Sequence, residues 1–356
     1  MKKTFETTLA NLKVAVIGLG KQGRLHFKIC KSMKDIDIVA VADQSPRALR
    51  YAKAFGVTKH YQDYAKLFAN EDLDAAIIVL PNSLHTDCVI NAAQKGVNVF
   101  VEKPLAENAR ECEQIKRAVQ SNNIKLMVGH NFRFFDCIMK IKEWVDTGLL
   151  GEIKLAVFEY VINGPFSVSL LPSPIPEWFF SKDQNSMGIM DSGYHLVDLQ
   201  RWFFEPEPEI LLSRFSAVYN LPYKDSATIV SESGETRCVT NIGWFCKAPD
   251  PLKYNFRVIL HGTAGFVSTD DLTPNRYAHA LKEGSKNILR KLTNQRIHPL
   301  EYTYWISSYY REEAAFFDCI RRDEQPPVSA DDALKATRTI EQIMQKVAGS
   351  TAYVNS

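Results

Sequence analysis

The chain lacks three features that would assign it to a specialised class of protein. No apolar run approaches the ~18 residues that a membrane-spanning helix needs. Its formal net charge is only +2, so no overall field attracts nucleic acid. The first residues, Met1 to Glu6, are not followed by an apolar stretch long enough for a signal peptide. We therefore expect a cytoplasmic protein that binds neither membrane nor nucleic acid.

The seven cysteines form no pattern typical of a cross-linked or metal-binding protein. They are odd in number and without a CxxC pair, at positions 30, 88, 112, 137, 238, 246 and 319. We expect reduced thiols and no metal site. Internal repeats and low-complexity segments are also missing. A chain of 356 residues, 46% of them hydrophobic, buries a core without disulfides and favours two domains.

A glycine motif in its full context is the most informative feature that is present. It follows the apolar run 13–17 at once, and a helix pattern follows it. The motif consists of Gly18, Leu19, Gly20, Lys21, Gln22 and Gly23. Strand, glycine turn and helix together predict a βαβ unit that binds a dinucleotide. Within the turn we expect every residue except Leu19 to contact the cofactor. We expect Gly18 to make the tight turn, Gly20 to admit the pyrophosphate at the helix N-terminus, and Gly23 to allow close packing of helix and strand.

An acidic residue closes the second strand of this unit. Asp43 follows the apolar run 36–42 and lies 20 residues after Gly23 (43 − 23). A carboxylate at this place accepts hydrogen bonds from the adenosine ribose and repels the 2′-phosphate of NADP. Asp43 therefore favours NAD over NADP. Arg47 is either a solvated residue of the next helix or a partial offset to that repulsion.

The first 130 residues alternate strands and helices, which predicts a doubly wound parallel sheet of the Rossmann type. Further strands are expected at 74–80, 97–101 and 125–129, and helices at 85–95, 108–122 and 136–147. We assign residues 1–130 to an NAD-binding Rossmann domain. Residues 131–356 are assigned to an α+β domain for substrate binding and oligomerisation.

The pattern changes to long β-rich runs after residue 150. These runs cover 152–162, 210–219, 226–232, 236–244 and 253–260. They predict a large open, mostly antiparallel sheet with a helix or two on one face. The other face is either solvated or a partner surface. The apolar residues Trp244, Phe245 and Phe256 favour a partner surface, and with it a homodimer or homotetramer.

Two segments do not fit either pattern. Residues 163–187 are proline-rich around Trp178, and we expect either a lid over the site or a clasp between subunits, with Trp178 stacking on a substrate ring. The stretch 274–300 is strongly basic. Between positions 282 and 296 it holds Lys282, Lys286, Arg290, Lys291 and Arg296 against Glu283. This stretch is either a solvated excursion or a phosphate contact for an anionic substrate such as a nucleotide sugar.

A lysine follows the strand at 97–101, within the motif Glu102-Lys103-Pro104. Ligands of open α/β sheets bind beyond the carboxyl ends of the strands, so we expect Lys103 at the substrate. Its amine is suited to polarising a substrate oxygen or transferring a proton. The alternative is a surface lysine whose stem lies along apolar groups.

A second group of chemical residues lies in the segment 188–198. Asp191 and His195 are four residues apart, so in a helix they share one face. A carboxylate beside an imidazole orients the ring and raises its basicity, which suits a general base that takes a hydroxyl proton. The alternative is a helix-capping Asp191 with a core His195.

These motifs together resemble the Gfo/Idh/MocA family of NAD(P)-dependent dehydrogenases, which includes glucose–fructose oxidoreductase and inositol dehydrogenase. The resemblance covers nearly the whole chain. It depends on four motifs, which are Gly18 to Gly23, Pro81 to His85, Glu102 to Pro104 and Asp191 to His195. One departure is visible, because Ser186-Met187-Gly188 replaces the glycine pair or triplet that members often carry there. That departure concerns the shape of the substrate pocket more than the chemistry.

The resemblance implies roles for residues that spacing alone does not assign. Lys103, Asp191 and His195 match catalytic positions that also contact substrate. The cofactor path is matched by Pro81, Asn82 and His85, with Glu102 near the nicotinamide and Lys103 beside it. A further segment that often reaches cofactor or substrate is matched by Asn131 and Arg133.

We therefore expect an NAD-dependent dehydrogenase that oxidises a secondary hydroxyl of a sugar, a sugar derivative or a cyclitol. His195 would take the proton, oriented by Asp191, while Lys103 stabilises the developing alkoxide; a swap of roles between Lys103 and His195 stays open. One alternative is a glycosidase that uses held NAD for transient oxidation. Another is a non-catalytic sugar or NAD sensor, which retention of the three proton-transfer groups disfavours.

Overall fold

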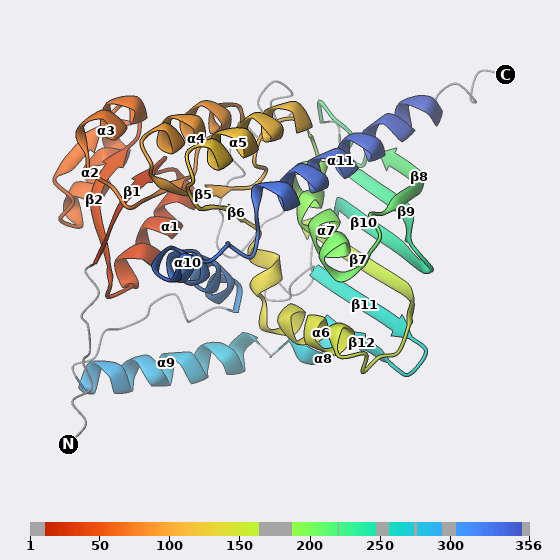
Figure 1. Ribbon diagram of the computed structural model, residues 1–356. Helices are drawn as coiled ribbons and strands as arrows, with labels where there is room; N and C mark the ends of the chain where they lie inside the picture. The colour runs from red at the N-terminus through yellow and green to blue at the C-terminus, as the bar shows by residue number, and fades with distance from the viewer. Residues whose placement is uncertain are drawn as a thin grey trace.

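The computed structural model describes residues 11–163, 187–219, 221–246, 256–273, 276–293 and 304–350. Figure 1 shows two sheets side by side, with helices from both halves of the chain between and around them. None of the described helices is long and apolar enough to cross a membrane. All six cysteines whose side chains are described are free and buried.

The first sheet has six parallel strands in the order β3-β2-β1-β4-β5-β6. They are β1 Leu12–Ile17, β2 Ile36–Ala42, β3 Lys59–Tyr61, β4 Ala75–Ile78, β5 Asn98–Glu102 and β6 Leu126–Gly129. Every residue of β4 is buried, because helices cover both faces of the sheet. The strand order reverses between β1 and β4, which is the place where open α/β sheets bind ligands. The predicted Rossmann architecture is confirmed.

Three of the five helices of this half begin at a residue whose side chain caps the helix. The five helices are α1 Lys21–Ser32, α2 Pro46–Ala54, α3 Tyr64–Asn70, α4 His85–Gln94 and α5 Ala109–Ser121, with 3₁₀ turns η1 Asn82–Leu84 and η2 Asn131–Phe134. Ser45 caps α2 by accepting a hydrogen bond from Ala48 N, and Asn108 caps α5 by accepting one from Glu111 N. In contrast, Gly20 at the start of α1 offers no side-chain cap.

The second sheet also has six strands, in the order β12-β11-β7-β10-β9-β8. They are β7 Ile153–Asn163, β8 Glu209–Ser216, β9 Ser226–Ser233, β10 Thr236–Cys246, β11 Phe256–Gly262 and β12 Phe266–Ser268. The sheet is mostly antiparallel, as predicted, but its central strands β7 and β10 run parallel. The direction in which β7 and β10 pair depends on contacts between distant segments. The alternation of apolar and polar residues within a strand does not indicate that direction.

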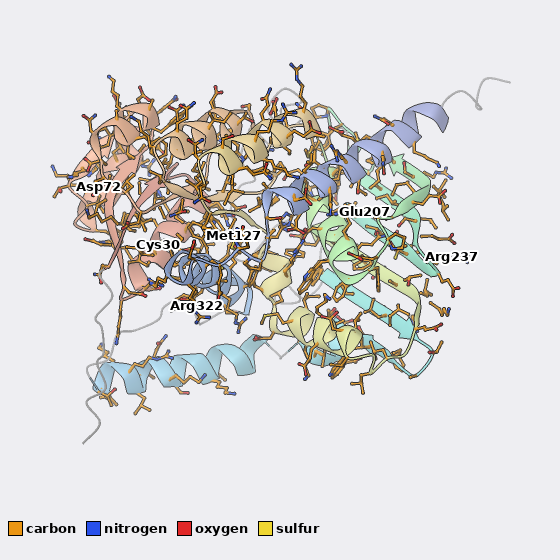
Figure 2. The ribbon with its side chains drawn as sticks, viewed as in Figure 1. Cys30, Asp72, Met127, Glu207, Arg237 and Arg322 are labelled. Carbon is orange, nitrogen blue, oxygen red and sulfur yellow. The ribbon has the colours of Figure 1, made fainter. Side chains whose placement is uncertain are left out.

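Helices cover one face of the second sheet (Figure 1). They are α6 Asp136–Asp146, α7 Met190–Phe203 and α11 Ala330–Ser350, and the short α8 Thr269–Leu272 follows β12. Trp244 and Phe256 point to this covered side and are only 1% and 7% exposed. The argument that these two aromatics face water was therefore wrong, while the side chain of Phe245 lies outside the described residues. Figure 2 shows Arg237 projecting from the outer side of the sheet.

The end of the chain returns to the first sheet. Helix α10, Tyr304–Arg322, packs along α1, and Phe316, Phe317 and Val328 join the hydrophobic core of the first sheet. Helix α11 then contacts both α5 and α7, as the blue ribbon in Figure 1 shows. The two halves therefore share a continuous apolar contact through the C-terminal helices.

The basic stretch contains a helix, α9 Arg276–Leu292, which lies along the edge of the molecule in Figure 1. Leu281, Ile288, Leu289 and Leu292 on it are more than half exposed. This helix was not predicted from the sequence. Apolar residues at helical spacing among the charges were the available signal.

Candidate active site

The glycine turn at the end of β1 is shaped by two close approaches. Gly18 has φ +87°, and a Cβ there would lie 2.0 Å from Val79 O. A Cβ on Gly23 would lie 1.9 Å from Gly18 O. Both positions therefore require glycine, because no side chain can move backbone atoms aside cheaply.

Gly20 differs, because a Cβ on it would meet nothing within 4 Å. It is also the N-cap of α1 and supplies no side-chain hydrogen bond to the N–H groups of the first turn. An open space beside uncapped donors at the positive end of a helix suits a pyrophosphate. The turn therefore fits the phosphates of a dinucleotide.

Asp43 is tied to the glycine turn. Its Oδ2 accepts a hydrogen bond from Leu19 N at 2.6 Å, and its Oδ1 accepts one from Ser45 N at 2.7 Å. Each carboxylate oxygen keeps a second lone pair, so contact with ribose hydroxyls stays compatible with these bonds. Asp43 thus positions the turn as well as presenting a negative charge at its edge.

A cleft of about 610 Å³ opens beside the start of α1. Its lining consists of Leu19, Gly20, Lys21, Arg24, Leu25, Lys28, Arg47 and Ile306. Four of these side chains are cationic and none is acidic, which complements the charge of a dinucleotide's phosphates. Arg47 is thus placed at the cleft, and not on a remote part of α2.

Lys103 and Asp191 meet across the two halves of the chain. The Lys103 ammonium donates to Asp191 Oδ2 and to the Asp191 carbonyl, both at 2.9 Å. The side chains are only 15% and 6% exposed. A charge pair this well enclosed is screened little by solvent, so it fixes the ammonium at the end of β5. The structure therefore brings together two of the three predicted catalytic residues by direct contact.

His195 lies one turn along α7 from Asp191 but is not paired with it. Its ring stacks on Phe132 with the centroids 4.1 Å apart and lies edge-on to His130 at 6.1 Å. Its Nδ1 is buried and has no hydrogen-bond partner in the described structure. The expectation that Asp191 orients His195 was wrong, because the Asp191 carboxylate is bound to Lys103.

The surroundings of His195 disfavour its charged form. Burial, with the Lys103 and His130 charges as smaller causes, holds the pKa of His195 well below its ordinary value. His130 behind it is fully buried at 3.3 Å from Asp198, and burial lowers its pKa to about 4. His195 is therefore a neutral imidazole with an unpartnered nitrogen, able to accept a hydrogen bond or a proton.

Two aromatic residues that the sequence did not indicate pack against the Phe132 ring, which stacks on this histidine. Tyr160 on β7 and Trp305 on α10 both contact Phe132 edge-on, with centroids 5.4 Å away. The Asp191 charge adds to burial in raising the pKa of Tyr160 to about 12. These rings come from elements far apart in the chain, so no local sequence pattern predicts that they meet.

Three residues of the expected cofactor path begin α4 or precede it. His85 is 1% exposed, and its ring nitrogens lie 2.8 Å from Pro104 O and 2.9 Å from Leu80 O. His85 therefore buttresses the backbone after Lys103 and is not free to contact a cofactor. Pro81 is exposed and Asn82 is buried at the start of η1; their contact with cofactor stays a prediction.

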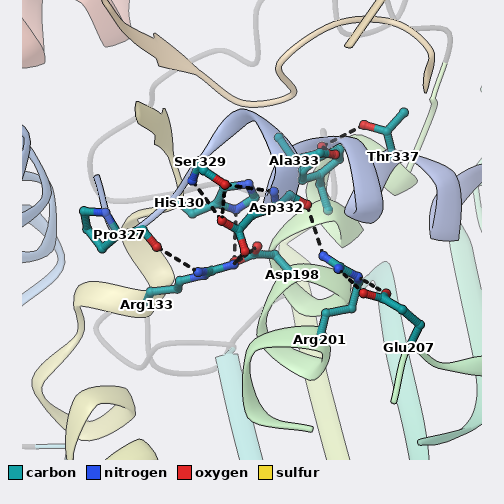
Figure 3. A network of polar contacts seen from close by, with 11 residues as sticks. His130, Arg133, Asp198, Arg201, Glu207, Pro327, Ser329, Asp332, Ala333 and Thr337 are labelled. Carbon is teal, nitrogen blue, oxygen red and sulfur yellow. Dashed lines mark hydrogen bonds and ion pairs between the residues drawn. The ribbon is translucent and has the colours of Figure 1, made fainter. Parts of the chain in front are cut away.

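Arg133 and Asn131 are engaged inside the protein. Arg133 donates to both carboxylate oxygens of Asp198, at 2.7 and 2.5 Å, and to Pro327 O at 3.3 Å (Figure 3). Asn131 is buried and donates to Ser308 Oγ at 3.1 Å. The structure thus gives Arg133 a structural role between η2, α7 and the start of α11, in place of the expected cofactor contact.

Two further expectations fall partly outside the described residues. Trp178 and nearly all of the segment 163–187 lie there, as does Arg296. Lys282, Arg290 and Lys291 are placed on α9, and a phosphate contact by them stays a prediction.

Both halves of the chain match family models. Residues 12–130 match the oxidoreductase family with the NAD-binding Rossmann fold, and residues 138–268 match the GFO/IDH/MocA C-terminal domain. The glycine turn, Asp43 and the Lys103–Asp191 pair lie within these two regions. The fold and the site define an NAD-dependent oxidoreductase, and the chain belongs to the Gfo/Idh/MocA family.

Similar proteins include two dehydrogenases of inositols. The chain is 25% identical to inositol 2-dehydrogenase of Rhizobium meliloti, with 95% of this chain and 97% of the relative covered. It is 26% identical to scyllo-inositol 2-dehydrogenase (NAD(+)) of Bacillus subtilis, with 90% of each covered. The crystal structure of Lactobacillus casei scyllo-inositol dehydrogenase with bound NAD(H) and scyllo-inositol superposes with a TM-score of 0.75, at 21% identity over 96% of this chain and 98% of that one.

Proposed function

We propose that this protein is an NAD-dependent dehydrogenase that oxidises a secondary hydroxyl of a cyclitol, a sugar or a sugar derivative. The observation that carries the proposal is the Lys103–Asp191 pair beside a neutral His195 at the carboxyl end of β5. An ammonium, a carboxylate that fixes it and an uncharged imidazole are the groups that oxidation of an alcohol requires. The inositol dehydrogenases among the relatives favour a polyhydroxylated ring as substrate.

The residues divide the work in the following way. NAD held by the glycine turn and Asp43 supplies the acceptor for the hydride that leaves the carbinol carbon. His195 accepts the hydroxyl proton, since burial keeps the ring unprotonated. Lys103 donates a hydrogen bond to the same oxygen and stabilises the negative charge that develops there. Asp191 holds the Lys103 ammonium in place through the 2.9 Å contact.

Substitution of the two proton-handling residues tests this assignment. Lys103→Met and His195→Ala should each lose about 100-fold or more in kcat, the cost of removing one acid–base group. Both variants should still bind NAD, because neither residue belongs to the glycine turn. Lys154→Met is the matched control, since Lys154 also forms ion pairs with acidic residues but lies on the outer face of the second sheet. Near-normal turnover in either site variant would remove that residue from the mechanism.

The substrate class is tested by NADH formation across a panel of inositols, free sugars, sugar acids and nucleotide sugars. Turnover of a ring alcohol with stoichiometric NADH supports the dehydrogenase. Release of a sugar from a glycoside without net NADH would instead support the NAD-dependent glycosidase. Tight sugar binding without either reaction would support a sensor.

The anionic-substrate hypothesis is a narrower form of the same proposal. Four cationic residues of α9, Lys282, Lys286, Arg290 and Lys291, support it. Reversal of Arg290 and Lys291 to glutamate should raise KM for a phosphorylated substrate and leave KM for a neutral inositol unchanged. Kinetics of the variant that are unchanged from the parent with both substrates would show that these residues are only a solvated surface.

A further inference from the structure

A series of buried polar side chains links strand β5, which precedes Lys103, to helix α10. His26, on the side of α1 that faces α10, lies at its centre and is fully buried. Its Nε2 lies 2.8 Å from Glu102 Oε1, and its Nδ1 lies 2.7 Å from Glu313 Oε1. Cys30, seen between α1 and α10 in Figure 2, donates to Glu313 Oε2 at 3.1 Å. The mechanism above uses none of these groups.

Glu102 is the end of this series that meets the active site. Its Oε1 accepts hydrogen bonds from His26 and, at 3.3 Å, from Gln22 Nε2 in the glycine turn. Its Oε2 accepts a hydrogen bond from the backbone N–H of Lys103 at 3.1 Å. One carboxylate therefore contacts the cofactor turn, helix α1 and the backbone of the catalytic lysine.

The charges of this cluster are set by burial and pairing. Burial alone would lower the pKa of His26, but Glu102 and Glu313 outweigh it and raise the pKa to about 10, so the ring is an imidazolium. Glu102 stays ionised, because His26 and Lys103 overcome burial and lower its pKa. Glu312 differs from them, because its carboxyl has no hydrogen-bond partner among the described residues and burial raises its pKa well above the ordinary value.

We propose that His26 is a positioning residue for Lys103: by holding the Glu102 carboxylate at its Nε2, it keeps that carboxylate off the Lys103 ammonium, which stays bound to Asp191. This inference rests on the role proposed above for Lys103. Glu102 directly precedes Lys103, so two carboxylates compete for one ammonium. His26 removes one of the competitors.

Loss of the imidazolium would leave the Glu102 carboxylate with only neutral donors, Gln22 Nε2 and the backbone N–H of Lys103. The Lys103 ammonium is then the cation that still lowers the pKa of Glu102. Glutamate has three side-chain torsions, so the released carboxylate turns toward that ammonium and draws it from Asp191. A misplacement of about 1 Å at a reacting group costs about 100-fold in rate.

His26→Gln, Glu102→Gln and the double variant test this mechanism in a double-mutant cycle. Glutamine at position 26 carries no charge, so it cannot hold the Glu102 carboxylate through an ion pair. Glu312→Gln is the matched control. Glu312 is a buried neutral acid on α10, the helix that carries Glu313, and it makes no hydrogen bond to His26 or Glu102 in the described structure. For each folded variant, kcat, KM and the Kd of NAD are measured below the melting temperature.

We expect His26→Gln to lower kcat by about 10- to 100-fold, with KM and the Kd of NAD close to those of the parent. In the Glu102→Gln background the same substitution should change kcat by no more than about twofold, because no carboxylate remains to be restrained. Full additivity of the two substitutions, or an unchanged kcat in His26→Gln, would overturn the proposal. If His26→Gln does not fold, the double variant His26→Gln/Glu102→Gln decides. A kcat tenfold lower in this double variant than in Glu102→Gln would also overturn the proposal.

A readout without turnover separates this inference from the proposed function. The Lys103 Nζ resonance in protein labelled with ¹⁵N-lysine, assigned by its loss in Lys103→Met, should shift in His26→Gln and stay in place in Glu312→Gln. A resonance that does not move in His26→Gln refutes the positioning role. Retained turnover in Lys103→Met refutes the proposed function instead, whatever the resonance shows.

Discussion

The Lys103 ammonium lies 2.9 Å from the Asp191 carboxylate, on opposite sides of the boundary between the two halves of the chain. This contact takes up the carboxylate that would otherwise serve His195. The proton acceptor of the proposed reaction is therefore an imidazole without an acidic partner, held between the Phe132 ring and the His130 edge. Burial lowers the pKa of this ring and so holds it in the neutral form.

The acid side of the pH profile tests this arrangement. The pKa of His195 lies well below its ordinary value of 6.5, so the neutral form persists as pH falls through 6.5. We expect kcat/KM to stay level from pH 8 to about 6, where a histidine of ordinary pKa would already lose activity. Measured profiles from pH 5 to 9 check this. An acid limb near 6.5 that disappears in His195→Asn would contradict the neutral, desolvated state of the ring.

Two glycines of the cofactor turn should respond differently to alanine. Gly20→Ala should fold normally, because its Cβ meets no protein atom, but should weaken NAD binding by filling the space meant for the pyrophosphate. Gly23→Ala should lower both the melting temperature and NAD affinity, because its Cβ would lie 1.9 Å from a carbonyl oxygen. Thermal melts with and without NAD distinguish them. Unchanged NAD affinity in Gly20→Ala would show that the pyrophosphate does not bind beside Gly20.

The choice of cofactor depends on Asp43. We expect tighter binding of NAD than of NADP, since the 2′-phosphate would meet this carboxylate. Asp43→Ala should narrow the difference, although it also removes the acceptors of Leu19 N and Ser45 N. Titrations of both dinucleotides into the parent and into Arg47→Glu complete the test. Tighter NADP binding in the parent that is lost in Arg47→Glu would show that the cationic cleft dominates.

The buried His26 should make the fold sensitive to alkali. Its folded pKa of about 10 is raised above the ordinary 6.5, so its stabilising contribution is complete below pH 6.5 and is lost as pH rises through about 10. A pKa difference of one unit between the folded and unfolded states corresponds to about 1.4 kcal/mol. The free energy of unfolding should therefore fall by several kcal/mol across this pH window. Urea unfolding at pH 7 and pH 10 measures it. His26→Gln serves as the reference, and an equal fall in that variant would assign the effect to other groups.

The outer face of the second sheet predicts an oligomer. Leu212, Val230, Val239, Val157 and Ile259 are cross-strand neighbours in one row over five strands. The sequence neighbours of the last four are buried in the core, and Leu212 itself is exposed, so this row faces away from the core. Lysine at positions 157 and 239 together should yield monomers in sedimentation, while Asn70→Lys on α3 should not. A parent protein that already sediments at the 40.4 kDa of one chain would contradict the prediction.

Much of the fold could be predicted because it depends on local patterns. The glycine turn, the run before Asp43 and the repeated strand–helix units specify a Rossmann sheet through backbone sterics and hydrophobic period. The β-rich runs likewise specify strands, though the parallel pairing of β7 with β10 depends on chain segments about 80 residues apart. Helix α9 was missed because its charges were weighed above its periodic leucines.

The sequence by itself determined which chemical groups enter the site, because Lys103, Asp191 and His195 stand in motifs with fixed local geometry. Only the tertiary structure decided how they pair. Asp191 is four residues from His195 along the helix, yet the Lys103 ammonium offers it a full charge in an enclosed place, and that attraction outweighs a neutral ring. The same holds for Glu102, whose partner His26 is 76 residues away in the chain. Long-range pairing of buried charges follows from packing, which spacing along a chain does not record.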